Sequence, residues 1–230
     1  MLIIVDYRIS KPALLELEKM GSVVLFRSEK LQGPLDGHAD VCIFHNGSET
    51  ILAPDAPEYI QQELRKHGVP FSTGERPSGS SHPDTAIYNA AGSKGLLIHN
   101  TRFTEPKIRS LYPTENINNV KQGYSRCSTL ILNDDAIITS DEGIAAALQR
   151  NRKNVLLVKS KNITLPGLPY GLFGGCCGGI RNTIFMAGSL SFLEDGEIIR
   201  AFIENAGFQL VELQPTIPQD VGGIFIFEDD

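Results

Sequence analysis

Short runs of β-branched and aromatic residues recur along the chain, and a polar or glycine-containing turn follows each run. A second apolar run comes after each turn, which predicts a series of β-hairpins. Asp40, Asp84 and Ser128, taken as equivalent points, are about 44 residues apart, which indicates an internal repeat. The runs that begin the repeats are residues 38–44, 82–88, 126–132 and 180–186.

Amphipathic helices are predicted after three of the hairpins. The first has apolar side chains at helical spacing and ends before Gly68. The second begins with acids and ends with a base, as the helix dipole favours, and Ser140 is its expected N-cap. The helices cover residues 57–67, 141–150 and 196–205, and strands are expected at 155–158 and 208–213.

The two ends of the chain together supply one more repeat. Residues 222–227 resemble the first strand of a unit, and residues 2–5 supply its second strand. A helix at 11–20 and a strand at 22–26 complete it. We therefore predict a single α/β domain over residues 1–230. It would consist of five ββαβ units in a closed pseudo-five-fold propeller, with the fifth unit split between the termini. A doubly wound sheet also alternates strands and helices, but it has no hairpin before each helix.

Composition and charge narrow the functional classes. The formal net charge of −6 argues against a nucleic-acid backbone as the main partner, because phosphate binding requires a basic face. No apolar run reaches the roughly 18 residues of a membrane span. The four cysteines form no C-x-x-C pair, so we expect a reduced, cytoplasmic protein without a disulfide framework, metal or cofactor.

The arrangement of five ββαβ units in a ring resembles the pentein superfamily, also called the guanidino-group-modifying enzyme fold. That superfamily includes arginine and agmatine deiminases, dimethylarginine dimethylaminohydrolase, amidinotransferases and a non-enzymatic ribosome anti-association factor. The chain is also similar to an uncharacterised bacterial family of this fold. The segments that carry this similarity are residues 121–128, 138–144, 165–167, 170–175 and 220–223.

In such a ring, the turns leading into the first strands gather at one mouth of a central channel, which is the default pocket for a small-molecule ligand. The polar residues expected there are His38, Asp40, His82, Asp84, Arg126, Cys127, Arg181, Asn182 and Asp220.

The resemblance implies a cysteine-dependent hydrolase or transferase that acts on a guanidine or amidine. In the superfamily's enzymes, carboxylates hold the guanidinium, a cysteine thiolate attacks its carbon, and a histidine of an H-x-D motif protonates the departing amine. Here the motif matches His38-Ala-Asp40 and His82-Pro-Asp84, and Cys127 directly precedes a predicted first strand. Cys127 is therefore the candidate nucleophile, and His38 or His82 is the candidate acid–base group. Arg126 is expected to favour the thiolate. The candidate substrate-binding residues are Asp40, Asp84, Arg126, Asp220 and Arg181.

One departure from the superfamily pattern keeps a second hypothesis open. The superfamily's enzymes carry their cysteine at the start of the last unit, where this chain has Gly222 and Gly223. The alternative is a non-catalytic binding protein, with Cys127 a buried small thiol and the histidines structural. Cys176 and Cys177 lie in a glycine-rich segment, 171–179, which we expect to form a tight loop over the channel mouth.

Overall fold

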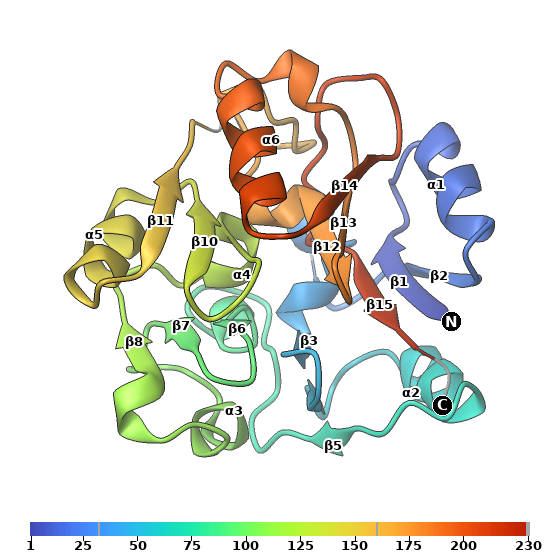
Figure 1. Cartoon of the computed structure of the whole chain (residues 1–230). Coiled ribbons are helices and arrows are strands. Elements are labelled where there is room, and N and C mark those ends of the chain that lie inside the picture. The colour runs from blue at the N-terminus through green and yellow to red at the C-terminus, as the bar shows by residue number, and fades with distance from the viewer. Residues whose placement is uncertain (32, 160, 229–230) are drawn as a thin grey trace.

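The computed structural model describes residues 1–31, 33–159 and 161–228, and its strands form five three-stranded sheets. Figure 1 shows these sheets arranged around a common centre. The strands are β1 (Leu2–Asp6), β2 (Ser22–Phe26), β3 (Ile43–His45), β4 (Thr50–Leu52), β5 (Ser72–Thr73), β6 (Ala91–Gly92), β7 (Leu97–His99), β8 (Ile117–Asn119), β9 (Thr129–Ile131), β10 (Ala136–Thr139), β11 (Asn154–Leu157), β12 (Cys177–Ile180), β13 (Thr183–Met186), β14 (Gln209–Glu212) and β15 (Phe225–Phe227).

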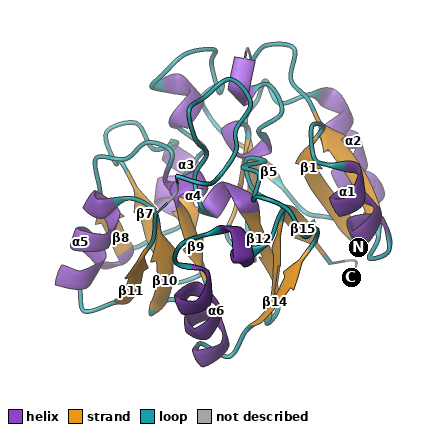
Figure 2. Ribbon diagram, turned by 90° about the horizontal axis from the view of Figure 1, so that it is seen from above, coloured by secondary structure: helices purple, strands orange, loops and turns teal. Residues whose placement is uncertain are grey.

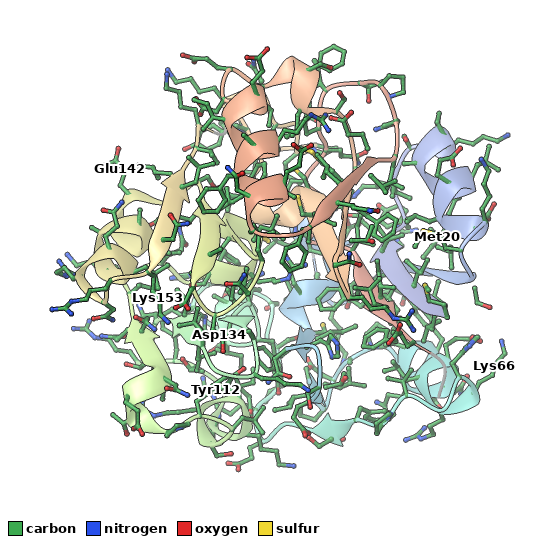
Figure 3. All side chains as sticks on the ribbon, viewed as in Figure 1. Met20, Lys66, Tyr112, Asp134, Glu142 and Lys153 are labelled. Atoms are coloured by element: carbon green, nitrogen blue, oxygen red, sulfur yellow. The ribbon has the colours of Figure 1, made fainter. Side chains whose placement is uncertain are left out.

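All five sheets share one topology. The central strand pairs antiparallel with one neighbour and parallel with the other. The antiparallel pairs are hairpins in four of the sheets, whereas the parallel pair needs a crossover, which a helix supplies. The crossover helices are α1 (Lys11–Glu18), α2 (Glu58–Lys66), α3 (Pro106–Ser110), α5 (Glu142–Arg150) and α6 (Gly196–Asn205). Lys66 on α2 and Glu142 on α5 point outward from the molecule (Figure 3).

The sheet β15–β1–β2 joins the two ends of the chain. β15 pairs antiparallel with β1, and Leu2 lies opposite Phe227. β1 then pairs parallel with β2 after the crossover through α1. The predicted division of one unit between the N- and C-terminal segments is therefore confirmed.

Burial changes from one edge of each sheet to the other. The central strands β1, β4 and β10 are buried at every position. The outer strands β2, β11 and β14 alternate between exposed and half-buried residues along most of their length. The core therefore lies toward the shared centre.

Among the described residues, no helix is long and apolar enough to cross a membrane.

The structure corrects three details of the sequence-based interpretation. The N-cap of α5 is Asp141, whose side chain accepts a hydrogen bond from the Ile144 N–H, and not Ser140. The second unit's first strand is Ala91–Gly92, because a 3-10 helix at Asp84–Ala86 occupies the run expected to be that strand. In the fourth unit, residues 183–186 form the second strand and the first begins at Cys177.

In four units a short helical turn precedes the first strand. In the first three of these units the turn delays the start of the strand by two or more residues, whereas in the fourth it ends before Cys177, so the strand starts earlier than expected. These turns are the 3-10 helices Ala39–Val41, Asp84–Ala86 and Gly174–Cys176 and the single-turn helix α4 (Ser125–Ser128). We call them the leading turns. Long loops gather above the strands in Figure 2.

Candidate functional site

Two leading turns bring Cys127 and Asp40 together. The thiol Sγ of Cys127 donates to Asp40 Oδ2 at 2.7 Å, although the residues are 87 positions apart in the sequence. Both side chains are buried. Asn89 completes the surroundings of the thiol: its Nδ2 donates to Sγ at 3.4 Å, and its Oδ1 accepts from the backbone N–H of Cys127.

His38 lies between three carboxyl groups. Its Nδ1 is 3.9 Å from Asp40 Oδ1, and its Nε2 is 3.8 Å from Asp220 Oδ1 and 3.9 Å from Asp6 Oδ2. The side chain is 1% exposed, yet neither ring nitrogen has a hydrogen-bond partner among the described residues. Asp40 Oδ1 also has none. Buried polar atoms are normally satisfied, so these unpartnered atoms distinguish the cluster from the rest of the buried interior.

Asp6 belongs to this cluster because it ends the buried strand β1. Arg8 folds back onto it, with Nη2 2.6 Å from Asp6 Oδ2 and Nε 2.9 Å from Oδ1. Arg8 also lies 3.2 Å from Asp36. The charge of Asp6 is therefore compensated within the protein, while Asp40 and Asp220 have no guanidinium hydrogen bonded to them in the described chain.

Asp220 connects the cluster to the glycine-rich segment. Its Oδ2 accepts from Leu172 N at 2.8 Å, and its Oδ1 accepts from Gly222 N at 3.0 Å. A Cβ on Gly175 would collide with the Asp220 carboxylate, so the segment can approach only as glycine. Residues 171–176 thereby cover this side of the cluster.

Arg126 points away from the thiol that follows it. Its Nη1 and Nη2 donate to the carbonyl oxygens of Gly174 and Cys177 at 2.8 and 3.0 Å, and the guanidinium lies over the Phe225 ring. It lowers the pKa values of Asp40 and Asp220 through its charge, but these are not the dominant effects on either group. The expected activation of Cys127 by Arg126 is therefore not visible in the geometry.

The electrostatic state of the cluster follows from its burial. Burial, followed by the charges of Asp40 and Asp220, raises the pKa of the Cys127 thiol well above its usual value. Burial raises the pKa of Asp40 to about 6, and the nearby His38 opposes that rise. Burial also raises the pKa of Asp220. Cys127 and Asp40 thus hold one proton between them at neutral pH, and the thiol carries it.

The other predicted site residues lie elsewhere. The Asp84 side chain is 51% exposed and pairs with Arg76, while His82 is exposed and packs against the rings of Phe103 and Tyr124. No hydrogen bond or ion pair joins His82 or Asp84 to Cys127 in the described part of the chain.

The structure places Arg181 away from the Cys127 cluster. Arg181 and Asn182 form the turn between β12 and β13, at the far end of the hairpin from the leading turn. The Arg181 side chain is 78% exposed and pairs with Glu228. The misplacement follows directly from the register of the fourth unit, whose first strand begins earlier than the sequence pattern suggests.

A separate cavity of ≈ 620 Å³ opens at the hairpin end of the first strands. Residues of β3, β6, β9, β12 and β15 line it, together with Arg126. The Arg126 side chain therefore lines this cavity, while the next residue in the sequence, Cys127, belongs to the buried cluster. The cavity and the buried cluster are two distinct regions at the centre of the molecule.

Several residues of the cluster had not been expected from the sequence. Asp6 was detectable in principle, because a carboxylate that ends an apolar strand is uncommon unless it is paired. Asn89 gave no signal, since an asparagine after a short helical turn usually serves the backbone. The two cysteines of the glycine-rich segment, Cys176 and Cys177, are buried. Burial raises the pKa values of both thiols, that of Cys177 to about 12.

Comparisons with known proteins place this arrangement in context. Residues 4–225 match the profile of a family described as "Family of unknown function (DUF6873)", and the chain belongs to that family. The structure is similar to that of the agmatine deiminase of C. jejuni, with a TM-score of 0.55 over 93% of this chain and 86% of that chain. The sequences are 9% identical, so the likeness concerns the fold alone. Comparison with curated proteins finds no match.

The structural likeness bears out the coarser part of the sequence-based interpretation. The five three-stranded sheets and the similarity to agmatine deiminase establish a pentein-like α/β fold. A buried cysteine lies beside a histidine and an aspartate at its centre, and the potential ligand atoms of His38, Asp40 and Cys127 are all within 4.8 Å of one another. This arrangement is compatible with guanidine-modifying chemistry.

Proposed function

We propose that this protein is a cysteine-dependent hydrolase or transferase of a guanidine or amidine compound, with Cys127 as nucleophile and His38 as acid–base group. The observation that carries the proposal is the contact between Cys127 and Asp40, with His38 beside them and both ring nitrogens of His38 unsatisfied. Asp40 and Asp220 are the carboxylates that would hold the cationic substrate.

The charges of the cluster explain why a cation would be both bound and activated. Burial, followed by the charges of Asp40 and Asp220, raises the pKa of the Cys127 thiol, so the free protein holds it protonated. A guanidinium between these carboxylates would cancel their field and favour the thiolate. The substrate would thus remove the contribution of the carboxylates to the raised pKa and help to generate its own nucleophile.

The hydrolytic reaction balances with one water molecule. The Cys127 thiol passes its proton to His38, and the thiolate then adds to the central carbon of the guanidinium with formation of a C–S bond. His38 gives a proton to the departing nitrogen, the C–N bond breaks and ammonia or an amine leaves. His38 then takes a proton from water, which attacks the same carbon. Cleavage of the C–S bond releases a urea-type product and restores the thiol.

We also infer that the five sheets close into a ring, since each neighbouring pair makes a contact. The ring centroids of His45 on β3 and Phe227 on β15 lie 4.9 Å apart, which joins the split unit to the first unit. A Cβ on Gly92 of β6 would meet Phe44 of β3, so these two sheets are also in contact. β6 lies against β9, and β12 lies against β15. A Cβ on Gly174 would collide with Thr129, which joins the remaining pair.

Turnover of guanidines tests the reaction. The full chain is incubated with a panel of guanidine and amidine compounds, agmatine included, and ammonia and the urea-type product are quantified. We expect at least one compound to be converted, with an adduct on Cys127 detected by mass spectrometry after an acid quench. Cys127→Ser should abolish conversion, whereas Cys177→Ser, a buried thiol nearby, should retain it. Conversion by Cys127→Ser at the wild-type rate would refute the proposal.

The second candidate is a non-catalytic protein that binds a small cation in the same place. The complete burial of the cluster and the protonated state of Cys127 favour it. Calorimetric binding of a guanidine compound without any conversion, lost in Asp40→Asn, would support this candidate over the enzyme.

A further inference from the structure

We propose that His38, Asp40 and Cys127 form a binding site for a borderline-soft divalent metal ion of the zinc class. One nitrogen, one oxygen and one sulfur ligand atom lie within 4.8 Å of one another, and all three side chains are buried. Imidazole, carboxylate and thiolate are the three ligand types that zinc takes in proteins. The proposal does not depend on the proposed reaction, because binding of an ion requires no turnover.

The spacing of the three ligand atoms suits a tetrahedral ion. Ion–ligand bonds of about 2.0–2.3 Å place neighbouring ligand atoms about 3.5 Å apart. In the structure His38 Nδ1 is 3.9 Å from Asp40 Oδ1, and Asp40 Oδ2 is 2.7 Å from Cys127 Sγ. Small rotations of side chains therefore bring all three around one point, with the fourth position left for water or a ligand.

Two of the three ligand atoms are free to coordinate. His38 Nδ1 and Asp40 Oδ1 accept or donate no hydrogen bond within the described residues. An ion would satisfy both atoms at once and would replace the proton of the Cys127 thiol. Asn89, which donates to Sγ at 3.4 Å, could keep that hydrogen bond to a metal-bound thiolate.

The far side of His38 has the groups that support a metal-bound imidazole. Its Nε2 lies 3.8 Å from Asp220 Oδ1 and 3.9 Å from Asp6 Oδ2. A ligating histidine usually donates its other ring N–H to a carboxylate, which fixes the ring and strengthens the ligand. Asp6 is itself held by Arg8 and Asp220 by two backbone N–H groups, so both are oriented.

Charge balance also fits a dication. With the thiol deprotonated, Cys127, Asp40 and Asp220 are three buried negative groups beside Arg126. A divalent ion together with Arg126 offsets them, as buried charges require. The same carboxylates are proposed to hold the guanidinium, so the ion and the cationic substrate would compete.

Cobalt binding tests the site directly, because Co²⁺ in a tetrahedral site with a thiolate ligand absorbs in the near-ultraviolet through charge transfer from sulfur. The reduced full chain is titrated with Co²⁺, and then Zn²⁺ is added to displace it. We expect one ion per chain, a charge-transfer band, and loss of the band when Zn²⁺ is added. Zn²⁺ should also raise the thermal unfolding midpoint.

Variants decide which residues bind the ion. Cys127→Ser should abolish the charge-transfer band, and His38→Gln and Asp40→Asn should each weaken Zn²⁺ binding at least about tenfold. Cys42→Ser and Cys177→Ser are matched controls, each a buried thiol outside the site, and should keep the band. Thermal unfolding of each variant without metal verifies that it folds. Absence of the band from the folded wild-type protein, or its persistence in Cys127→Ser, would overturn the site while leaving the proposed reaction untouched.

Discussion

Cys127 Sγ lies 2.7 Å from Asp40 Oδ2, to which it donates, and both groups are buried. Burial and the carboxylates raise the pKa of the thiol, and burial raises that of Asp40 to about 6. A free thiolate is disfavoured in this setting, whereas a cation between the carboxylates is favoured. The site is therefore suited to a positively charged ligand that brings about deprotonation of Cys127.

The pH dependence of stability should reveal Asp40. Its pKa rises from 3.8 in the unfolded chain to about 6 in the folded protein, so the folded state binds the proton more tightly. The stability that this group supplies is complete below pH 4 and is lost as the pH rises through 6. Between pH 4 and 7, the unfolding free energy of Asp40→Asn should gain roughly 2 kcal/mol relative to wild type. Urea denaturation across that range measures it.

Exposed Asp135 supplies the control for that measurement, because its side chain is 83% accessible to solvent. The difference between Asp135→Asn and wild type should vary far less with pH. A constant difference between Asp40→Asn and wild type across the same range would show that Asp40 is not perturbed by its surroundings.

His99 should give the opposite pH dependence. Burial lowers its pKa to about 4, and its ring bonds to the Gly123 carbonyl at 2.9 Å and to the Thr104 hydroxyl at 2.8 Å. The unfolded chain therefore takes up a proton at this residue before the folded protein does, so stability is lost as the pH falls from 6.5 through 4.

A comparison with His99→Gln isolates this effect. The unfolding free energy of wild type should fall by about 3 kcal/mol more than that of the variant between pH 7 and pH 4. Urea denaturation at both pH values measures it. Parallel pH profiles for the two proteins would contradict the buried neutral state of His99.

Gly222 should tolerate no side chain. Its φ of +64° disfavours other residues, and a Cβ there would lie 2.7 Å from His38 Cγ. Gly207 has a φ of +87° but open space around the Cβ position. Gly207→Ala should lower the unfolding free energy by about 1 kcal/mol, from backbone strain alone. Gly222→Ala should lose roughly 2 kcal/mol more through overpacking against His38. Equal losses would mean that His38 does not pack against this turn.

The repeat could be predicted from the sequence because hydrophobic periodicity and turn residues act locally. Residues 22–26 and 196–205 form the expected strand and helix with the expected bounds. The division of one unit between residues 2–5 and 222–227 also followed from pattern alone. The leading turns could not be predicted in this way, because short 3-10 helices have no periodic signature of their own.

The candidate site was predictable only in part, for the same reason. The H-x-D motif at His38 and the position of Cys127 before a strand identified two residues that the structure brings together. The H-x-D motif at His82 matches equally well, but the structure does not bring His82 to Cys127. The motif carries no information on which turn faces the buried centre. Arg181 was misplaced by the register of its unit, and Asn89 acts through its own side chain without any motif.

The measurement that tests the central claim most directly is the rate at which Cys127 reacts with chloroacetamidine, which is cationic, and with neutral chloroacetamide. Each rate is divided by that of the denatured chain, and peptide mass spectrometry locates the label. If Asp40 and Asp220 recruit a cation to the thiol, the amidine should be favoured at least about tenfold in the native protein, and Asp40→Asn should reduce that preference. Equal normalised rates for the two reagents, or native protein with no label on Cys127, would contradict the account.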